Sequence, residues 1–191
     1  DGLGQLDGLC QTFSKDGFVA LSPAELENLE VPRRVQNYAD VGKAIVEAAA
    51  QKGILSLKGL RPAHDWHTAG RYAAFPQAGC WIGLDHELWL DFGRSPLWLF
   101  FRNTEWGRSL DVASAIRAHS PILKERMVFF EESRNLGIPL PLLPNVEKEQ
   151  VVEAGVEFLK GLAAVLVKAG LSEIGGAAPH EGEGDAAVRS K

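Results

Sequence analysis

The apolar run at residues 96–101 constrains the fold of this chain most strongly. It contains no polar residue and so lacks the alternation of polar and apolar side chains that marks a strand with one exposed face. A run of this kind is typical of a strand that is covered on both faces. We therefore predict that it forms a central strand of a sheet.

Two runs before it are short and rich in aromatic or β-branched residues, and a turn signal separates them. They lie at residues 71–75 and 80–84, with Pro76 and Gly79 between them, and they predict a β-hairpin. The next segment, residues 86–92, predicts a short helix that ends at a glycine. Strands and helix thus follow one another closely here.

The following part of the chain mixes helical and extended signals. Ser109 is placed to cap a helix that runs to about residue 119, and residues 127–130 have strand character. Residues 138–143 form another extended run. Because Pro139 and Pro141 cannot donate hydrogen bonds to a neighbouring strand, we predict an edge strand or an extended connection there.

Two helices are expected in the first third of the chain. A capping signature at Ser22 predicts a short helix to about residue 30, and Pro32 should end it. Apolar residues then recur at helical spacing through residues 35–53, up to the stop signal Gly53. This second segment predicts a long amphipathic helix.

A wide apolar stripe predicts a last helix, which Asn145 can cap and which Gly170 ends. We predict a single α+β domain at residues 1–170, with a mixed or antiparallel sheet of about four to five strands packed against amphipathic helices. Residues 171–191 are rich in Gly, Ala and Glu and lack the apolar residues that offset ordering entropy. We expect this tail to be disordered.

The composition limits the classes of partner and compartment. The formal net charge of −5 gives no overall attraction to phosphate backbones or anionic lipids. Cysteine is scarce, with only Cys10 and Cys80, which is typical of a reducing cytoplasm. No apolar run is long enough to span a bilayer and no signal peptide is apparent. The chain does not begin with methionine, and its only methionine is Met127. We therefore expect it to be a piece of a longer polypeptide.

A nucleic-acid partner would need a local basic patch. Basic residues interleave with aromatic rings in one part of the sequence, and such a mixture suits base stacking and phosphate contacts. The basic candidates for contact with nucleic acid or another partner are Lys58, Arg61, Arg71 and Arg94, and the rings among them are Trp66 and Tyr72. The alternative is that these are solvated loop charges and core rings.

Imidazole and carboxylate groups cluster around the predicted hairpin. The metal candidates are His64, His67 and His86, and the catalytic candidates are Asp85 and Glu87. Such groups suit a zinc or similar divalent ion, which would polarise a scissile bond and generate a hydroxide. The spacing matches no helical zinc motif, so ordinary polar loop residues are the alternative.

A metal nuclease would also need a carboxylate-x-Lys pair on the strand after its first acid. If Asp85 were that acid, the strand at residues 96–101 would have to supply the pair. It offers no carboxylate before Glu105. The catalytic hypothesis is weakened accordingly.

Residues 81–89 (WIGLDHELW) and 93–99 (GRSPLWL), preceded by 58–62 (KGLRP), resemble uncharacterised bacterial proteins encoded near restriction or defence genes. Some of those are assigned to the PD-(D/E)XK nuclease-like superfamily. The resemblance extends over residues 57–101, and the carboxylate-x-Lys pair of that superfamily is not found on the matching strand. It implies a degenerate nuclease-like core or an accessory domain beside a catalytic one.

From these observations we expect a cytoplasmic, non-catalytic recognition or interaction domain, associated with a bacterial nuclease or defence system. Its expected partner is a protein or a nucleic acid, and no cofactor is predicted. One alternative is a divalent-metal-dependent hydrolase or nuclease. Another is a small-molecule sensor with a pocket lined by Trp66, Tyr72 and Trp106.

Overall fold

The computed structural model describes residues 24, 28, 30–65 and 67–174, and the chain divides into two compact units, Asp1–Val35 and Gln36–Lys191. The first unit includes the start of helix α3 (Glu30–Gln51), where Glu30 accepts a hydrogen bond from Arg33 over 3.2 Å. The helix predicted to begin at Ser22 lies largely outside the described residues. Pro32 does not end a helix, because it stands in the first turn of α3, where a proline removes no intrahelical hydrogen bond.

The second unit is built on a six-stranded sheet with the order β1-β2-β3-β4-β6-β5, in which every neighbouring pair is antiparallel. The strands are β1 (Pro62–His64), β2 (Thr68–Ala74), β3 (Gly79–Asp85), β4 (Leu97–Phe101), β5 (Val128–Phe130) and β6 (Asn135–Pro139). Helices accompany this sheet, so the predicted α+β class is confirmed. The sheet has one or two strands more than expected.

The predicted hairpin and central strand are both present. Strands β2 and β3 pair along their whole length, from Thr68 opposite Asp85 to Ala74 opposite Gly79. Strand β4 lies between β3 and β6, and four of its five side chains are buried. The exception is Phe100, which is half-buried, so only part of one face of β4 is covered.

Residues 138–143 were predicted to form an edge strand or an extended connection. Residues 140–143 lie outside the strands and helices, but Ile138 and Pro139 belong to β6, and for them the prediction of an edge strand is wrong. Strand β6 lies inside the sheet, and the short strand β5 forms that edge. Pro139 is tolerated because β5 pairs with β6 only as far as Gly137, so the missing N–H of the proline interrupts no hydrogen bond to β5. Beyond it, the amide of Leu140 donates to the carbonyl of Leu97 over 2.9 Å and continues the pairing with β4.

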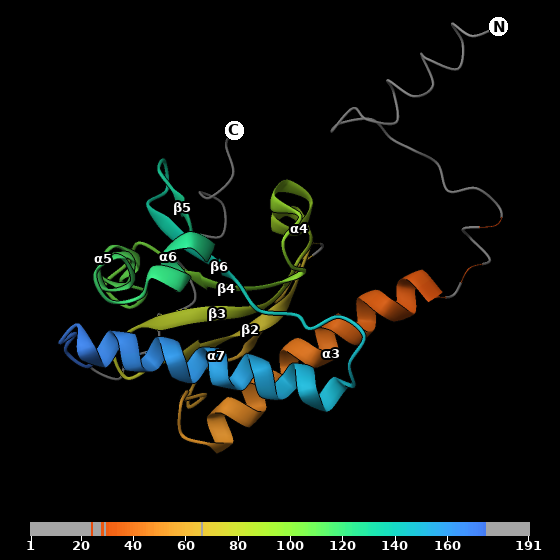
Figure 1. Cartoon of the computed structure of the whole chain (residues 1–191), viewed down its shortest axis with the longest axis horizontal. Coiled ribbons are helices and arrows are strands. Elements are labelled where there is room, and N and C mark those ends of the chain that lie inside the picture. The colour runs from red at the N-terminus through yellow and green to blue at the C-terminus, as the bar shows by residue number, and fades with distance from the viewer. Residues whose placement is uncertain (1–23, 25–27, 29, 66, 175–191) are drawn as a thin grey trace, which may run out of the picture. The chain divides into compact units, whose positions relative to one another are not determined.

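Helices α3 and α7 (Lys148–Lys168) cross on one side of the sheet (Figure 1). At the crossing, a Cβ added at Gly155 of α7 would lie 2.5 Å from Cδ1 of Ile45 of α3, so the glycine allows the close approach. Three residues before Ile45 in α3, a Cβ added at Gly42 would lie 3.1 Å from Cδ2 of Leu97 of β4. The side chains of β4 that share the orientation of Leu97 therefore face these helices.

The remaining helices are α4 (His86–Phe92), α5 (Ser109–His119) and α6 (Pro121–Arg126). Helix α5 packs on both α7 and β6. Helix α4 ends as predicted at Gly93, which has φ 59° and donates its amide to the carbonyl of Trp89. Phe92 at the end of α4 packs against Trp98, with the ring centroids 5.7 Å apart.

Two predicted caps are wrong. The residue before α5 is Arg108, with φ 50°, whereas Ser109 lies inside the helix and its hydroxyl donates to the carbonyl of Arg134. Helix α7 is capped by Glu147 and not by Asn145, because Glu147 and Gln150 form a reciprocal capping box. No side chain caps α5, whereas at α7 more than one residue had the chemistry of a cap.

The end of the last helix agrees with the prediction, since Gly170 has φ +69° just after α7. The segment that follows was predicted to be a disordered tail from residue 171. Residues 171–174 are described, and the amide of Ile174 donates to the carbonyl of Pro76 over 2.8 Å. Residues 175–191 of that tail lie outside the described residues.

Candidate functional site

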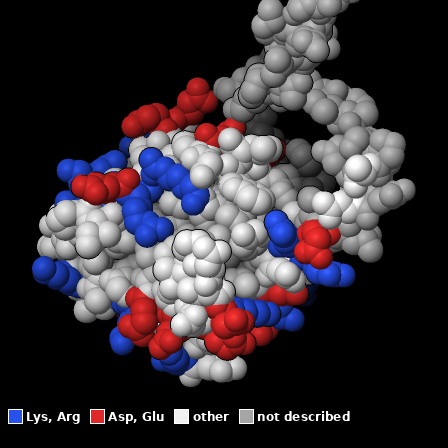
Figure 2. Space-filling view, turned by 45° about the vertical axis from the view of Figure 1, so that its right-hand side comes forward, with Lys and Arg blue, Asp and Glu red and all other residues white. Residues whose placement is uncertain are grey.

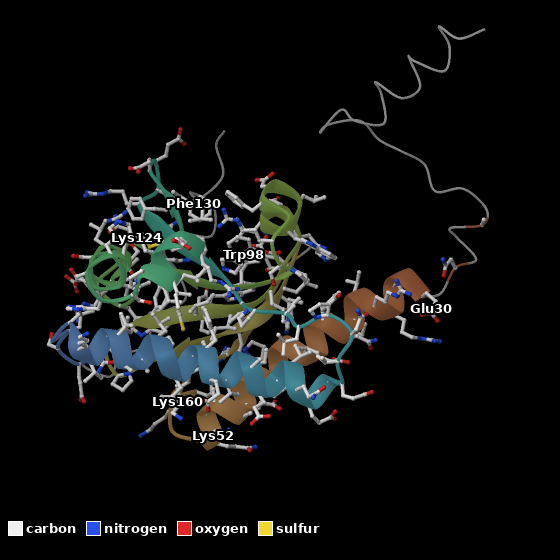
Figure 3. All side chains as sticks on the ribbon, in the orientation of Figure 1. Glu30, Lys52, Trp98, Lys124, Phe130 and Lys160 are labelled. Atoms are coloured by element: carbon white, nitrogen blue, oxygen red, sulfur yellow. The ribbon has the colours of Figure 1, made fainter. Side chains whose placement is uncertain are left out.

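Alternation along the strands gives the sheet two different faces. Leu97, Leu99 and Phe101 are fully buried toward the helices. Trp98 and Phe100 point to the opposite face, where Phe100 packs against Phe130 with the ring centroids 5.8 Å apart. Figure 3 shows Phe130 on β5 and Trp98 between β5 and helix α4.

A row of aromatic residues crosses three neighbouring strands on this opposite face. Tyr72 of β2 stands opposite Trp81 of β3, and Trp81 stands opposite Phe100 of β4. All three are half-buried. The amide of Tyr72 donates to the carbonyl of Arg61 over 3.3 Å, which extends the pairing of β1 and β2 by one residue. The exposed Arg61 therefore continues the row at its outer end.

Glycine backbone forms part of the floor beneath these rings. A Cβ added at Gly70 would lie 2.5 Å from the Trp81 ring, so that ring rests directly on the β2 backbone. A Cβ at Gly79 would lie 2.0 Å from the ring of Trp106, in the loop after β4. Larger residues at either position would displace an aromatic ring, and the glycines therefore help to hold the rings in place.

Trp106 and Arg102 complete one end of the row. The rings of Tyr72 and Trp106 meet edge to face with centroids 6.0 Å apart, and Cζ of Arg102 lies 6.0 Å from the centroid of Tyr72. We call the half-buried rings of Tyr72, Trp81, Phe100, Trp106 and Phe130 the aromatic face. Contiguous groups of partly exposed apolar side chains mark binding surfaces more often than isolated apolar residues do.

The charge on this face is uneven. Among the described strand residues that share its orientation, the only acidic one is Asp85, at the far end of β3. Its Oδ1 accepts a hydrogen bond from the amide of Leu88 over 2.9 Å and so caps helix α4. The charges adjoining Tyr72 are the guanidinium groups of Arg61 and Arg102.

Several of the predicted metal candidates meet at the end of the β2–β3 hairpin. The amide of His86 donates to the carbonyl of His67 over 3.0 Å, and Asp85 and Glu87 flank His86 in the chain. The exposed His64 ends the neighbouring strand β1. Within the part of the chain that the structure describes, however, no three His, Cys, Asp or Glu side chains form a group that could hold a metal ion.

An unpredicted polar contact involves Asp65 in the same region. Its Oδ1 lies 3.0 Å from Nδ1 of the buried His67. Burial disfavours the ionised carboxyl, but hydrogen bonds from the backbone of His67 and from Thr68 outweigh this effect, so the pKa of Asp65 is lowered. Asp65 accordingly stabilises the turn into β2.

The acidic residues considered for nuclease chemistry lie at opposite ends of the sheet. The amide of Asp85 donates to the carbonyl of Pro96, just before β4 begins, whereas Glu105 follows the end of β4. At about 3.4 Å per residue, the five residues of β4 separate these ends by roughly 17 Å. The fold does not bring these two carboxylates together.

The basic candidates fall into two places. Lys58, Arg61 and Arg71 lie around β1 and β2, where the side chain of the half-buried Arg71 donates to the carbonyl of Leu60. Arg94 donates instead to the carbonyl of Arg126 at the end of α6. Figure 2 shows one face of the molecule, on which positive and negative side chains are interspersed around a largely uncharged middle.

The sensor hypothesis named Trp66, Tyr72 and Trp106, of which Trp66 lies outside the described residues. Tyr72 and Trp106 are in contact, as described above. Two shallow cavities of about 340 and 380 Å³ lie beside Arg108 and Asp111, and neither is lined by Tyr72 or Trp106. These cavities are therefore separate from the aromatic face.

Cys80 belongs to the core. It is buried, its Sγ lies 3.3 Å from the carbonyl oxygen of Ala73, and burial raises the pKa of its thiol far above the ordinary range. Nucleophilic attack requires a thiolate, which this environment disfavours.

No family model, curated protein or solved structure matches this chain. None of the helices that the structure describes combines the length and the apolar character needed to cross a bilayer. The candidate site therefore rests on the geometry of the aromatic face. Sequence reasoning had named Tyr72 but had missed Trp81, Phe100 and Arg102, although alternation along the predicted hairpin would have placed Trp81 on the face of Tyr72.

Proposed function

We propose that this chain is a non-catalytic recognition or interaction domain that binds a macromolecular partner through the aromatic face. The observation that carries the proposal is the row of half-buried rings, Tyr72, Trp81 and Phe100, on neighbouring strands of one face. Helices α3 and α7 lie on the other face. Aromatic residues are enriched where proteins bind partners, because they offer a large contact area at a small entropic cost.

The polar groups near the hairpin support a non-catalytic role. Asp85 accepts the capping hydrogen bond of α4, and Asp65 accepts hydrogen bonds from the amides of His67 and Thr68. Cys80 is buried. Side chains engaged in local structure in this way stabilise the fold and are poorly placed to exchange protons with a substrate.

The cellular setting is part of the proposal. The sparse cysteines favour the cytoplasm. The resemblance of residues 57–101 to nuclease-like proteins favours an accessory role beside a bacterial nuclease or defence system. In such a role the domain would bind, and a separate catalytic domain would cut.

The proposal is tested by measuring binding and turnover on the full chain. Labelled DNA and RNA are incubated with the protein and with Mg²⁺, Mn²⁺ or Zn²⁺, and we expect no cleavage. Partner capture from a bacterial extract is then compared between the wild type, Tyr72→Glu and Lys124→Glu. Lys124 is exposed on α6, so it controls for adding a glutamate away from the aromatic face.

We expect one partner, identified by mass spectrometry, to be retained by the wild type and by Lys124→Glu and lost by Tyr72→Glu. Metal-dependent cleavage that Asp85→Ala abolishes would refute a non-catalytic role. Equal capture by both variants would refute the assignment of binding to the aromatic face.

A further inference from the structure

We infer that the aromatic face binds single-stranded nucleic acid, an inference that rests on the proposed function and names its partner. The sheet presents Arg61, Tyr72, Trp81 and Phe100 as one continuous row. Neighbouring strands lie about 4.8 Å apart, so the Cα atoms of Tyr72 and Phe100 are separated by roughly 10 Å. Rings spaced in this way on a sheet can each receive an unpaired base.

The charges next to the row suit a phosphate backbone. Arg61 lies at the outer end of the row, and the guanidinium of Arg102 lies 6.0 Å from the centroid of Tyr72. The one acidic residue among the described strand residues of this face, Asp85, lies four residues along β3 from Trp81. At about 3.4 Å per residue this places it roughly 14 Å away along the strand. Two guanidinium groups thus adjoin Tyr72, although the whole chain carries −5.

A single strand fits this face better than a duplex does. Bases in a duplex are stacked on one another, and their faces are closed to protein rings. Binding of a duplex relies on many phosphate contacts, whereas this face has two arginines next to its rings. An apolar peptide would also pack on the rings, but it would draw little from the two arginines.

Fluorescence anisotropy with labelled 12-nucleotide oligo-dT and oligo-U, and with a duplex of the same length, tests the inference on the full chain. We expect both single strands to bind more tightly than the duplex. Trp81→Leu should weaken binding about 5- to 150-fold, the range that follows from losing one stacked base. Trp81→Phe should retain binding to within a few-fold, because the ring remains.

Arg61→Gln should reduce the slope of log K against log salt by about 0.7, the value for one phosphate contact on a single strand. Lys124→Gln is the matched control, since it removes one exposed positive charge from α6, and it should leave the slope unchanged. Thermal unfolding by circular dichroism verifies that each variant is folded.

Absence of single-strand binding in 25 mM salt, or equal binding by Trp81→Leu and the wild type, would overturn the inference. If a protein partner were lost with Tyr72→Glu while no oligonucleotide bound, the inference would fail and the proposed recognition role would stand. If a bound oligonucleotide were cleaved with added metal, the proposed non-catalytic role would fail and the binding inference would stand.

Discussion

Replacement of Gly155 by alanine tests the contact between helices α7 and α3. The added Cβ would lie 2.5 Å from Cδ1 and 2.8 Å from Cγ1 of Ile45, and Ile45 is 0% exposed. Forcing an extra carbon into a packed core costs about 1 to 3 kcal/mol. Removing a glycine from a helix interior stabilises it by about 1 kcal/mol. We therefore expect Gly155→Ala to lower the free energy of unfolding by about 0 to 2 kcal/mol.

The same helix supplies a matched control. A Cβ added at Gly161 meets no atom within 4 Å, and the residue is exposed. Gly161→Ala should therefore raise the free energy of unfolding by about 1 kcal/mol through helix propensity alone. The difference between the two variants, about 1 to 3 kcal/mol, reports the contact with Ile45 without the propensity effect.

Urea unfolding followed by circular dichroism and tryptophan fluorescence measures both variants. In a chain of this size each kcal/mol also shifts the melting temperature by about 2 to 4 °C. Ile45→Val removes Cδ1, the carbon closest to the added Cβ. Alone, this substitution usually lowers the free energy of unfolding by about 0.5 to 1.5 kcal/mol. In the Gly155→Ala background we expect it to cost less, because it also relieves the clash. Equal unfolding free energies for Gly155→Ala and Gly161→Ala would refute the packing of α7 on Ile45.

Three further predictions concern the hairpin. Asp85→Ala should lower the free energy of unfolding by about 0.5 to 2 kcal/mol, because it removes the cap of α4, and a change within error in urea unfolding would contradict that role. Since the pKa of Asp65 is lowered, its ionised form contributes stability above its ordinary pKa of 3.8, and this contribution is lost as the pH falls through the folded value. Asp65→Asn should therefore lose less stability than the wild type as the pH is lowered from about 5 to 2, and parallel losses would oppose this reasoning. In a Cys10→Ser protein, a thiol reagent should modify Cys80 only after unfolding, so labelling of the native protein at the rate of free cysteine would show that the thiol is accessible.

The signals that predicted well act over a few residues. The pairing of β2 with β3 followed from two short strand-like runs separated by Pro76 and Gly79. Gly93 and Gly170 both end helices with positive φ, a conformation that glycine adopts without a steric penalty. Because these signals are local, the sequence could predict that a hairpin, a short helix and a buried strand follow one another in this order.

The caps show where local chemistry was insufficient. Ser109 and Asn145 have side chains that can cap a helix, yet neither does so. Ser109 instead donates its hydroxyl to the carbonyl of Arg134, a contact 25 residues away in the sequence. Which of several suitable residues caps a helix depends on the contacts available to each in the folded chain.

By itself, the sequence determined the α+β class, the central position of β4 and the locations of the hairpin and the long helices, because alternation, helical spacing and glycine stops are local properties. Only the tertiary structure decided that β6 lies between β4 and β5, since strand pairing joins segments that are distant in the chain. The same pairing separated Arg94 from Arg61 and Arg71 and placed Tyr72, Trp81 and Phe100 in one row. The candidate site depends on strand register, which periodicity within a single strand does not specify.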